Sequence, residues 1–263
     1  MKKIVSVQDL SCLGKCSLTV ALPVLSAMGC VCTPLPTAVL STHTAFPAPH
    51  IRSLTEDIDS MIRHWQSIGA KFDAISVGYL SDPRQAETVL HLVQAFPATV
   101  ILDPVLGDHG KLYAGITPEH VVALRQLCRQ ADVLLPNLTE AAALTGIPYQ
   151  EQGDEAYYKQ LLDALLSMGA KSVVLTGVSL AENTTGFMTS QAQLYQTRKL
   201  LGSFHGTGDL FAATFTGGLL QGKALFDAAA LAAGFVEKVI AGQTPTPFGV
   251  EFESHLPWLW EQL

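Results

Sequence analysis

The sequence predicts an α/β protein in which helices cover both faces of a doubly wound, mainly parallel β-sheet. Short runs of β-type composition alternate along the chain with helix-type patterns. Several of these runs are almost continuously apolar, which is typical of parallel strands buried on both faces. Repeated strand–helix–strand units with right-handed crossovers build a sheet of this kind.

The expected strands follow one another along the chain and finish with a hairpin. They are Ile4–Gln8, Val31–Leu40, Ala74–Gly78, Thr99–Asp103, Asp132–Leu135 and Ser172–Thr176, followed by the hairpin of Thr185–Thr189 and Gln193–Thr197.

The helix patterns between the strands carry start and stop signals. Ser81–Asp82–Pro83 offers an N-cap with a proline near the first turn, and Thr117–Pro118 does the same before Glu119–Arg129. Ser53–Gly69 and Asp154–Gly169 each end at a glycine, the usual C-terminal stop. The chain contains no obvious linker, low-complexity tract or internal repeat, so we expect a single domain over residues 1–263.

Composition excludes several classes of protein. Of the 263 residues, 48% are hydrophobic and 15% are charged, so the chain can bury a large core and is not disordered. The 16 Lys and Arg residues and 23 Asp and Glu residues give a net charge of −7, without a run of like charges. This argues against a nucleic-acid-binding surface, although backbone N–H groups could still hold an anionic ligand.

An uncharged stretch from Cys16 to Ile51 raises the question of a membrane span. Prolines interrupt it repeatedly, so a buried helix, a buried strand and a loop explain it better. The N-terminus runs directly into a strand pattern without a signal peptide, and we therefore expect a cytoplasmic protein without membrane contact. The spacing of Cys12, Cys16, Cys30 and Cys32 matches no common zinc module, which favours buried free thiols.

The segment His205–Gly206–Thr207–Gly208–Asp209 precedes an apolar helix rich in small residues. Its glycines allow a sharp turn in which successive N–H groups point at one anion, while the helix N-terminus adds partial positive charge. Asp209 would lie beside this anion hole, where a carboxylate can take the proton of a hydroxyl that attacks phosphorus. A plain glycine turn with an aspartate at a helix start explains the same residues. A dinucleotide fingerprint is less suitable, because Phe211 occupies its third glycine position.

Acidic and amide side chains follow two strands in the middle of the chain. Asp103 ends one expected strand, and Asn137 and Glu140 follow the next. Carboxylate and amide oxygens in this arrangement can hold hydrated Mg²⁺ against a triphosphate. Alternatively, Asn137 caps the following helix and Glu140 completes a capping box. Both interpretations can hold together, because capping fixes the geometry that a metal site requires.

A third polar group lies in the first part of the chain. Asp9 ends the first expected strand, His43 and Thr44 follow the second, and Tyr79 follows the third. Ligands of such sheets bind beyond the carboxyl ends of the strands, so these side chains could orient a small polar substrate. His43 and Tyr79 are also typical of ordinary core packing.

Taken in chain order, these motifs resemble those of a known family. They are Ser41–x–His43–Thr44, Asp103–Pro104–Val105 with Gly107–Asp108, Pro136–Asn137–x–x–Glu140 and Gly206–Thr207–Gly208–Asp209. The set is similar to that of the ribokinase-like superfamily, and within it to the pyridoxal/pyridoxine/pyridoxamine kinases. The resemblance implies a kinase that uses ATP and Mg²⁺ to phosphorylate the hydroxymethyl group of a B6 vitamer. It also suggests a homodimer and allows a monovalent cation as a further cofactor.

The resemblance implies a role for each matching residue. On the catalytic side, Asp209 matches the base, and Gly206, Thr207 and Gly208 match the anion hole. On the nucleotide side, Asp103 and Glu140 match the positions that organise Mg²⁺ and phosphates, with Asn137 in support and Thr176 as a phosphate contact. On the substrate side, Asp9, His43, Thr44 and Tyr79 match contacts to the pyridine ring and its substituents. The segment 107–113 resembles a loop that lies over the active site.

Departures from the family pattern define the alternatives. Asp9 stands where pyridoxal kinases usually have serine, which could favour an aminomethyl substrate. The expected lid contains no cysteine that could trap an aldehyde. The nearest alternative is a hydroxymethylpyrimidine kinase of thiamine synthesis, in which cysteine typically replaces Asp209. A non-catalytic B6-binding protein would keep the pocket and lose the base, and Asp209 argues against it.

Overall fold

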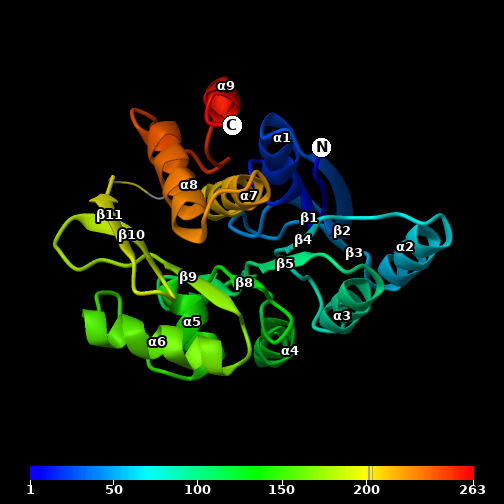
Figure 1. Cartoon of the computed structure of the whole chain (residues 1–263), viewed down its shortest axis with the longest axis horizontal. Coiled ribbons are helices and arrows are strands. Elements are labelled where there is room, and N and C mark those ends of the chain that lie inside the picture. The colour runs from blue at the N-terminus through cyan, green and yellow to red at the C-terminus, as the bar shows by residue number, and fades with distance from the viewer. Residues whose placement is uncertain (201, 203) are drawn as a thin grey trace.

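The structure, a computed structural model, describes residues 1–200, 202 and 204–263 (Figure 1). Its strands are β1 (Lys3–Leu13), β2 (Val31–Thr42), β3 (Ile51–Ser53), β4 (Ala74–Val77), β5 (Thr99–Leu102), β6 (Gly107–Asp108), β7 (Lys111–Leu112), β8 (Val133–Leu134), β9 (Ser172–Thr176), β10 (Thr184–Thr189) and β11 (Leu194–Arg198). Its α-helices are α1 (Leu18–Ala27), α2 (Thr55–Ser67), α3 (Gln85–Ala95), α4 (Pro118–Cys128), α5 (Leu138–Thr145), α6 (Glu155–Ser167), α7 (Thr207–Leu220), α8 (Leu225–Ile240) and α9 (Leu256–Trp260), with a short 3₁₀ helix at Glu253–His255.

Within the described residues, nine strands form one sheet in the order β11-β10-β9-β8-β5-β4-β1-β2-β3. The six strands from β9 to β2 in this order run parallel to one another. β3 is antiparallel at one edge, and the hairpin of β10 and β11 is antiparallel at the other. The prediction of a doubly wound, mainly parallel sheet is therefore confirmed, with β1 in its interior.

Helices cover both faces of the sheet and enclose two separate cores. The helices α1, α7, α8 and α9 pack on one face, and α2 to α6 pack on the other (Figure 1). Successive side chains of a strand point to opposite faces, so neighbouring residues enter different cores. Ile4 of β1 lies in the first core and Val5 in the second, and Val174 and Val173 of β9 divide in the same way.

The expected strands all form, but the first is longer than predicted. β1 continues to Leu13, so the prediction that Asp9 ends it is wrong. The pairing with β2 slips between Gln8 and Leu10, and Asp9 lies at this irregularity. After the slip, β1 regains hydrogen bonds to β2, which is a tertiary interaction that residue patterns do not reveal. The short strands β3, β6 and β7 were not expected either.

The helix boundaries agree with the sequence signals except at α3. Asp154 is the N-cap of α6 and accepts a hydrogen bond from the Tyr157 N–H over 2.8 Å. The predicted cap at Ser81–Asp82–Pro83 is wrong, because α3 begins at Gln85 after Arg84. The Ser81 N–H instead donates to Oε1 of Gln85 over 2.9 Å, which closes a turn before the helix starts.

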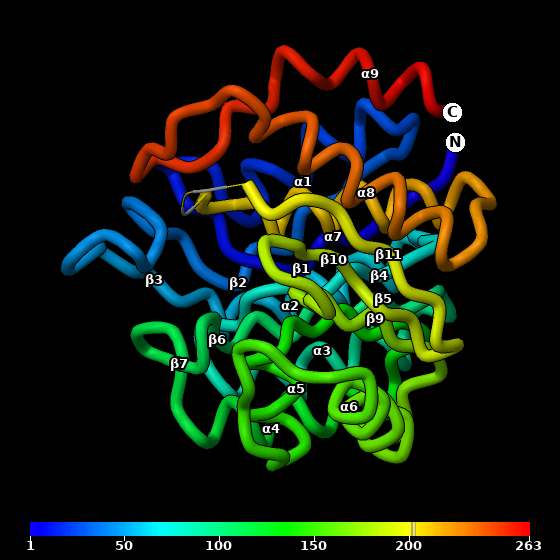
Figure 2. The backbone as a smooth tube through the Cα atoms, turned by 90° about the vertical axis from the view of Figure 1, so that its left-hand side faces the viewer, coloured from blue at the N-terminus to red at the C-terminus, as the bar shows by residue number. Residues whose placement is uncertain are grey.

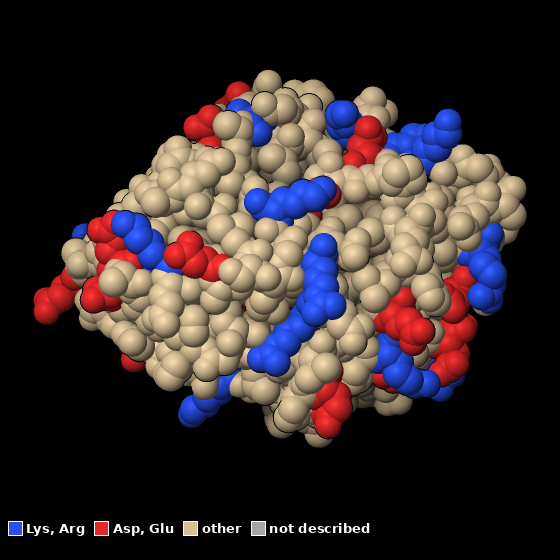
Figure 3. All heavy atoms as spheres, turned by 60° about the horizontal axis from the view of Figure 1, so that its bottom comes forward, with Lys and Arg blue, Asp and Glu red and all other residues tan. Residues whose placement is uncertain are grey.

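The surface features agree in part with the expectations from composition. The uncharged stretch forms α1, β2 and the loop that follows. Cys30 is buried, but Cys12 is exposed in the extension of β1, so the prediction of a buried thiol is wrong there. No helix in the described part of the chain has the length and apolarity to cross a membrane. On the face that Figure 3 shows, acidic and basic side chains lie scattered among uncharged atoms.

Candidate active site

A cavity of about 700 Å³ opens at the carboxyl ends of the parallel strands. Its lining includes all of the residues that the sequence singled out, which are Asp9, His43, Thr44, Tyr79, Asp103, Asn137, Glu140, Thr176, Gly206, Thr207, Gly208 and Asp209. Parallel strands bring their carboxyl ends to one edge of a sheet, which explains why residues far apart in the chain meet here.

The turn before α7 is packed tightly from behind. Gly206 is the N-cap of α7 with φ 85°, and a Cβ atom there would collide with the Lys15 carbonyl oxygen. The Lys15 N–H donates to the Phe248 carbonyl oxygen over 2.8 Å, and the Val250 N–H donates to the His205 carbonyl oxygen over 3.1 Å. Segments from the start and the end of the chain therefore fix the conformation of this turn.

Asp209 lies in the first turn of α7, where its carboxylate meets the start of α1. Burial raises the pKa of Asp209 from 3.8 to about 6, and the nearby charge of Asp9 acts in the same direction. Hydrogen bonds from the Ser17 N–H and the Cys16 thiol oppose this rise in pKa. A carboxylate with a pKa near 6 is ionised at neutral pH and still basic enough to accept a proton.

The second acidic group joins the loop after β5 to the start of α5. Glu140 is buried, and its Oε1 accepts a hydrogen bond from the Leu106 N–H over 3.1 Å. Its Oε2 accepts a hydrogen bond from the Asn137 N–H over 2.8 Å, while Asn137 Oδ1 accepts one from the Glu140 N–H over 3.0 Å. The predicted capping box therefore forms. It also anchors the loop that follows Asp103.

Asp103 and Glu140 are close enough to influence each other's ionisation. Burial raises the pKa of Asp103 first, and the charges of Glu140 and Asp209 raise it further. The pKa of Glu140 is raised by burial as well, against the hydrogen bonds from the backbone. A cation beside these carboxylates would relieve the repulsion that raises their pKa values.

The donor set at this point suits one kind of metal ion. Among the described residues, no group of three or more His, Cys, Asp or Glu side chains is arranged to hold a metal. Mg²⁺ often needs only one or two carboxylates, because waters and substrate phosphates complete its coordination. Asp103 is the better direct ligand of the pair, since backbone N–H groups already engage both oxygens of Glu140.

Asp9 and Tyr79 lie on the other side of the cavity. Asp9 is only 3% exposed, and its carboxylate accepts a hydrogen bond from the Ser11 hydroxyl over 2.8 Å. Burial raises the pKa of Asp9, against hydrogen bonds from Ser17 and Ser11. Burial also raises the pKa of Tyr79 to about 12, with the charge of Asp9 contributing. The Tyr79 phenol therefore stays protonated at neutral pH and can donate a hydrogen bond.

His43 is held in a cluster of rings at the edge of the cavity. Its Nε2 lies 2.9 Å from the Pro247 carbonyl oxygen, which makes this nitrogen the donor. The ring centroid lies 4.9 Å from that of Phe46 and 5.2 Å from that of His205. Burial lowers the pKa of His43, so the neutral imidazole predominates at neutral pH.

The small hairpin of β6 and β7 covers one side of the cavity. It projects from the same end of the molecule as β3 (Figure 2). The Tyr113 N–H donates to the Leu106 carbonyl oxygen over 2.9 Å, and the Gly110 N–H donates to Thr139 Oγ1 over 2.9 Å. Tyr113 lines the cavity together with Asp108 of the hairpin. The segment that resembles a lid therefore lies beside the candidate site.

Sequence reasoning missed much of the cavity lining, including residues of β10 and β11 and two further parts that bear on the chemistry. Cys16 and Ser17 touch the carboxylates of Asp209 and Asp9, and only their position just after the first strand could have pointed to them. The second part is an apolar wall at the end of the cavity near α7 and α8. It is formed by Phe204, Phe211, Ala212, Ala233, Val236 and Ile240. Its residues cannot be told from core residues in the sequence.

Comparisons with known proteins identify relatives along almost the whole chain. Residues 21–252 match the family model described as phosphomethylpyrimidine kinase. The pyridoxine/pyridoxal/pyridoxamine kinase of Bordetella bronchiseptica is 30% identical over 248 residues, which cover 88% of this chain and 85% of the relative.

Two solved structures resemble the chain closely. One, from Bacteroides thetaiotaomicron, is provisionally named a phosphomethylpyrimidine kinase and was solved with pyridoxal. It is 36% identical with a TM-score of 0.93, and the match covers 98% of this chain and 95% of that one. The other is the pyridoxal kinase of Lactobacillus plantarum, which is 33% identical with a TM-score of 0.92. The match covers 100% of this chain and 98% of that one.

Proposed function

The chain belongs to the phosphomethylpyrimidine kinase family of ribokinase-like proteins, and from this premise we propose that it is an ATP-dependent kinase of B6 vitamers. The reaction would transfer the γ-phosphoryl group of ATP to the hydroxymethyl group of pyridoxal, pyridoxine or pyridoxamine. The observation that carries the proposal is the position of Asp209 and the Gly206–Asp209 turn in the same cavity as Asp103 and Glu140.

Asp209 would act as the general base. Its carboxylate takes the proton of the acceptor hydroxyl as the oxygen attacks phosphorus. The N–H groups of Gly206, Thr207 and Gly208, together with the N-terminus of α7, stabilise the charge that develops on the transferring phosphoryl group. The Lys15 carbonyl behind Gly206 keeps these donors in place without reorganisation during the reaction.

The nucleotide would occupy the part of the cavity between the acidic group and the apolar wall. Mg²⁺, when bound, would neutralise phosphate charge beside Asp103 and Glu140. Asn137 would hold the loop at Gly107 through the hydrogen bond from its Nδ2 to the Gly107 carbonyl oxygen, which measures 2.8 Å. Thr176, at the end of β9, would donate its hydroxyl to a phosphate oxygen. The apolar wall would receive the base of the nucleotide.

The acceptor would lie between Asp9, His43, Thr44 and Tyr79. The Tyr79 phenol can donate a hydrogen bond, and the Asp9 carboxylate can accept one or pair with a cationic group of the vitamer. The relatives provide independent support, since one is named a kinase of all three vitamers and another was solved with pyridoxal.

Hydroxymethylpyrimidine kinase is the second candidate function, because the matching family model is described as phosphomethylpyrimidine kinase. Asp209 favours the vitamer kinase, since hydroxymethylpyrimidine kinases typically carry cysteine at this position. The choice therefore depends on the acceptor that the cavity binds, and not on the fold.

A direct assay tests the proposal. The purified protein is incubated with Mg²⁺-ATP and either pyridoxal, pyridoxine, pyridoxamine or hydroxymethylpyrimidine, and ADP release is measured. We expect kcat/KM for the best vitamer to exceed that for hydroxymethylpyrimidine by at least about tenfold. A preference for hydroxymethylpyrimidine would establish the second candidate, and pyridoxal binding without ADP release would indicate a non-catalytic carrier.

The family resemblance also suggests the domain organisation, the location, the oligomeric state and a monovalent cation. We propose that residues 1–263 act as one domain and that the protein works as a cytoplasmic homodimer. A monovalent cation beside the nucleotide phosphates is part of the same proposal. Sedimentation of the purified protein measures the oligomeric state, and replacement of K⁺ by a bulky organic cation in the assay measures the ion requirement.

A further inference from the structure

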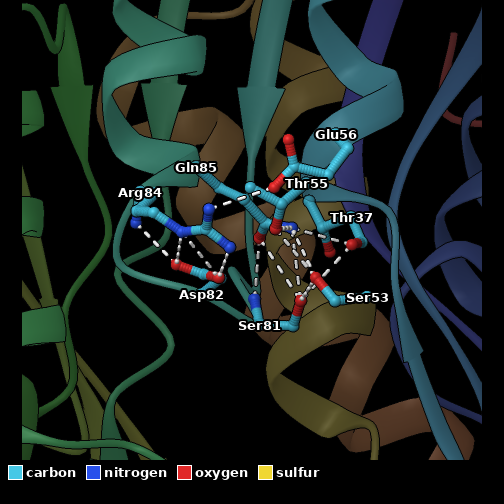
Figure 4. Close-up of polar contacts among 8 residues, drawn as sticks. All are labelled: Thr37, Ser53, Thr55, Glu56, Ser81, Asp82, Arg84 and Gln85. Atoms are coloured by element: carbon cyan, nitrogen blue, oxygen red, sulfur yellow. Dashed lines mark hydrogen bonds and ion pairs between the residues drawn. The ribbon is translucent and has the colours of Figure 1, made fainter.

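A buried polar network lies behind the acceptor side of the cavity, outside the residues assigned above. Its centre is Gln85, the first residue of α3, which has no solvent exposure. Figure 4 shows its amide surrounded by side chains and backbone atoms from β2, β3, the start of α2 and the loop after β4. These neighbours are Thr37, Ser53, Thr55 and Ser81.

The orientation of the Gln85 amide is fixed by its partners. Its Nε2 lies 2.8 Å from the Thr37 carbonyl oxygen, which can only accept a hydrogen bond. Its Oε1 lies 2.9 Å from the Ser81 backbone nitrogen, which can only donate one. The second Nε2 hydrogen points to Thr55 Oγ1 at 3.0 Å. All polar atoms of this buried amide are therefore paired, and the network is geometrically specific.

Through Thr37 the network reaches the substrate side of the cavity. The Thr37 side chain is buried, and its Oγ1 donates to the Tyr79 carbonyl oxygen over 2.8 Å. Thr37 also lies where the register of β1 and β2 slips, opposite Asp9. The Thr37 carbonyl oxygen accepts a hydrogen bond from the Leu54 N–H over 2.9 Å in addition to that from Gln85. Thr37 is thus bonded to the backbone of Tyr79 and lies in the part of β2 that runs beside Asp9.

The loop that carries Tyr79 is held by the sheet before Tyr79, and by this network at Tyr79 and after it. Before Tyr79, the Gly78 N–H continues the sheet by donating to the Val7 carbonyl oxygen over 2.8 Å. At Tyr79 the loop accepts the Thr37 hydroxyl, and two residues later Ser81 donates to Gln85. The loop has no regular secondary structure, so these hydrogen bonds hold the backbone from which the Tyr79 side chain projects.

We propose that Gln85 is a positioning residue for the acceptor. Gln85 acts through Thr37 to fix the position of Tyr79 and the irregular pairing of β1 and β2 around Asp9. The inference rests on the proposed function, because it assumes that the acceptor binds at Tyr79 and Asp9. Gln85 does not touch the cavity itself. Its loss therefore weakens acceptor binding and alters the preference among acceptors, while the nucleotide side is unaffected.

The primary test replaces the amide by an apolar side chain of similar length in Gln85→Leu. This removes one of the two donors to the buried Thr37 carbonyl, which keeps the Leu54 N–H, and leaves the partly buried Ser81 N–H without its acceptor. We expect KM for the vitamer to rise about tenfold, with KM for ATP changed less than about twofold. Thr37→Val removes only the hydroxyl bonded to Tyr79 and is expected to raise KM for the vitamer as well. In the double variant Gln85→Leu/Thr37→Val, the loss of acceptor binding free energy is expected to be smaller than the sum of the two single losses.

Two further variants separate positioning from loss of stability. Gln221→Leu removes the 2.7 Å hydrogen bond from Nε2 to the Met28 carbonyl oxygen at an exposed residue, and serves as the control for loss of a glutamine side-chain hydrogen bond away from the cavity. Gln85→Glu donates to the Thr37 carbonyl only while its carboxyl group is protonated. Its vitamer KM relative to that of the wild type is therefore expected to recover as the pH falls. Because the stability of this variant also recovers with falling pH, KM is measured at a temperature at which circular dichroism shows the variant to be fully folded at every pH.

The outcomes are distinct. A wild-type protein that phosphorylates no vitamer and binds no pyridoxal in a spectroscopic titration refutes the proposed function, and with it this inference. If the wild type is active, an unchanged vitamer KM in folded Gln85→Leu overturns the inference alone. An equal rise of both KM values does the same. If Gln85→Leu does not fold, Thr37→Val decides, and an unchanged vitamer KM in that variant overturns the inference.

Discussion

Asp209→Asn is expected to make the protein inactive and, at neutral pH, more stable. Asparagine has nearly the same shape as aspartate, but it cannot accept a proton in the reaction. Loss of a positioned general base lowers kcat by about 10²–10⁴-fold. Binding of ATP should change little, because the N–H groups of the anion hole belong to the backbone of the turn.

The size of the stability gain follows from the raised pKa of Asp209. The pKa is 3.8 in an ordinary aspartate and about 6 in the fold. This rise in pKa means that the ionised carboxylate lowers the free energy of unfolding by at most about 3 kcal/mol. Partial solvent exposure of Asp209 makes this an upper limit. In a protein of this size, each kcal/mol shifts Tm by roughly 2–4 °C.

The dependence on pH gives the prediction its sign. Below pH 3.8 the group is protonated in both the folded and the unfolded protein, and it costs the fold nothing. The folded state binds the proton more tightly, so stability is lost as the pH rises through about 6. The Tm advantage of Asp209→Asn should therefore grow between about pH 3.8 and pH 6, the pKa values of the unfolded and the folded state, and level off above pH 6. The wild-type rate should rise as the pH passes through about 6, the pKa of Asp209 in the folded protein, because only the carboxylate can accept the proton.

Calorimetry at several pH values and steady-state ADP release measure both effects. The control is Asp163→Asn, which removes a carboxylate from the exposed part of α6. Near-normal turnover of Asp209→Asn would refute the assignment of the base. A Tm difference that is the same at every pH would show that burial of the ionised carboxylate is not its cause.

Three other substitutions test separate parts of the site. Glu140→Gln replaces one of the two carboxylate oxygens that accept hydrogen bonds by an NH₂ group. We expect a loss of about 1–3 kcal/mol in unfolding free energy and a higher Mg²⁺ concentration at half-maximal rate. An unchanged Mg²⁺ requirement would leave only the capping role. Asp9→Ser is expected to reduce kcat/KM for pyridoxamine about 5–30-fold more than for pyridoxal, because the amine loses its ion pair, and equal losses in the two progress-curve assays would contradict this. Gly206→Ala should abolish turnover while far-UV circular dichroism stays native, since its Cβ would push the turn away from the Lys15 carbonyl oxygen; normal kcat would show that the turn adapts.

The sequence allowed the sheet and the polar residues at the carboxyl ends of its strands to be predicted, because both depend on local patterns. Parallel strands are apolar runs, and their carboxyl ends meet at one edge, so polar residues after those runs had to lie together. The roles of Asp209 and its glycines came from a family resemblance, which the comparisons confirm at the level of the family. From the residues alone, a plain glycine turn explained this motif as well.

The remaining features depend on contacts between distant segments. The extension of β1 beyond Asp9 forms through pairing with β2, and the start of α3 is set by the bond between Gln85 and Ser81. Cys16 was not assigned to the site from the sequence, because its importance comes from the approach of α7. Each of these positions has an ordinary residue type, and only the packed structure distinguishes it from a core or loop residue.

The packing of the turn at Gly206 has a consequence for the synthesis of the protein on the ribosome. The turn at Gly206 rests on Lys15, and Lys15 is in turn bonded to Phe248, so early and late parts of the chain complete it together. A nascent chain that ends before Phe248 already contains all the strands, but it lacks the segment that supports the turn at Gly206. Synthesis of a protein of this length takes many seconds at about 5–20 residues per second. During that time we expect the growing polypeptide to lack kinase activity, because the turn at Gly206 gains its support only when translation is nearly finished.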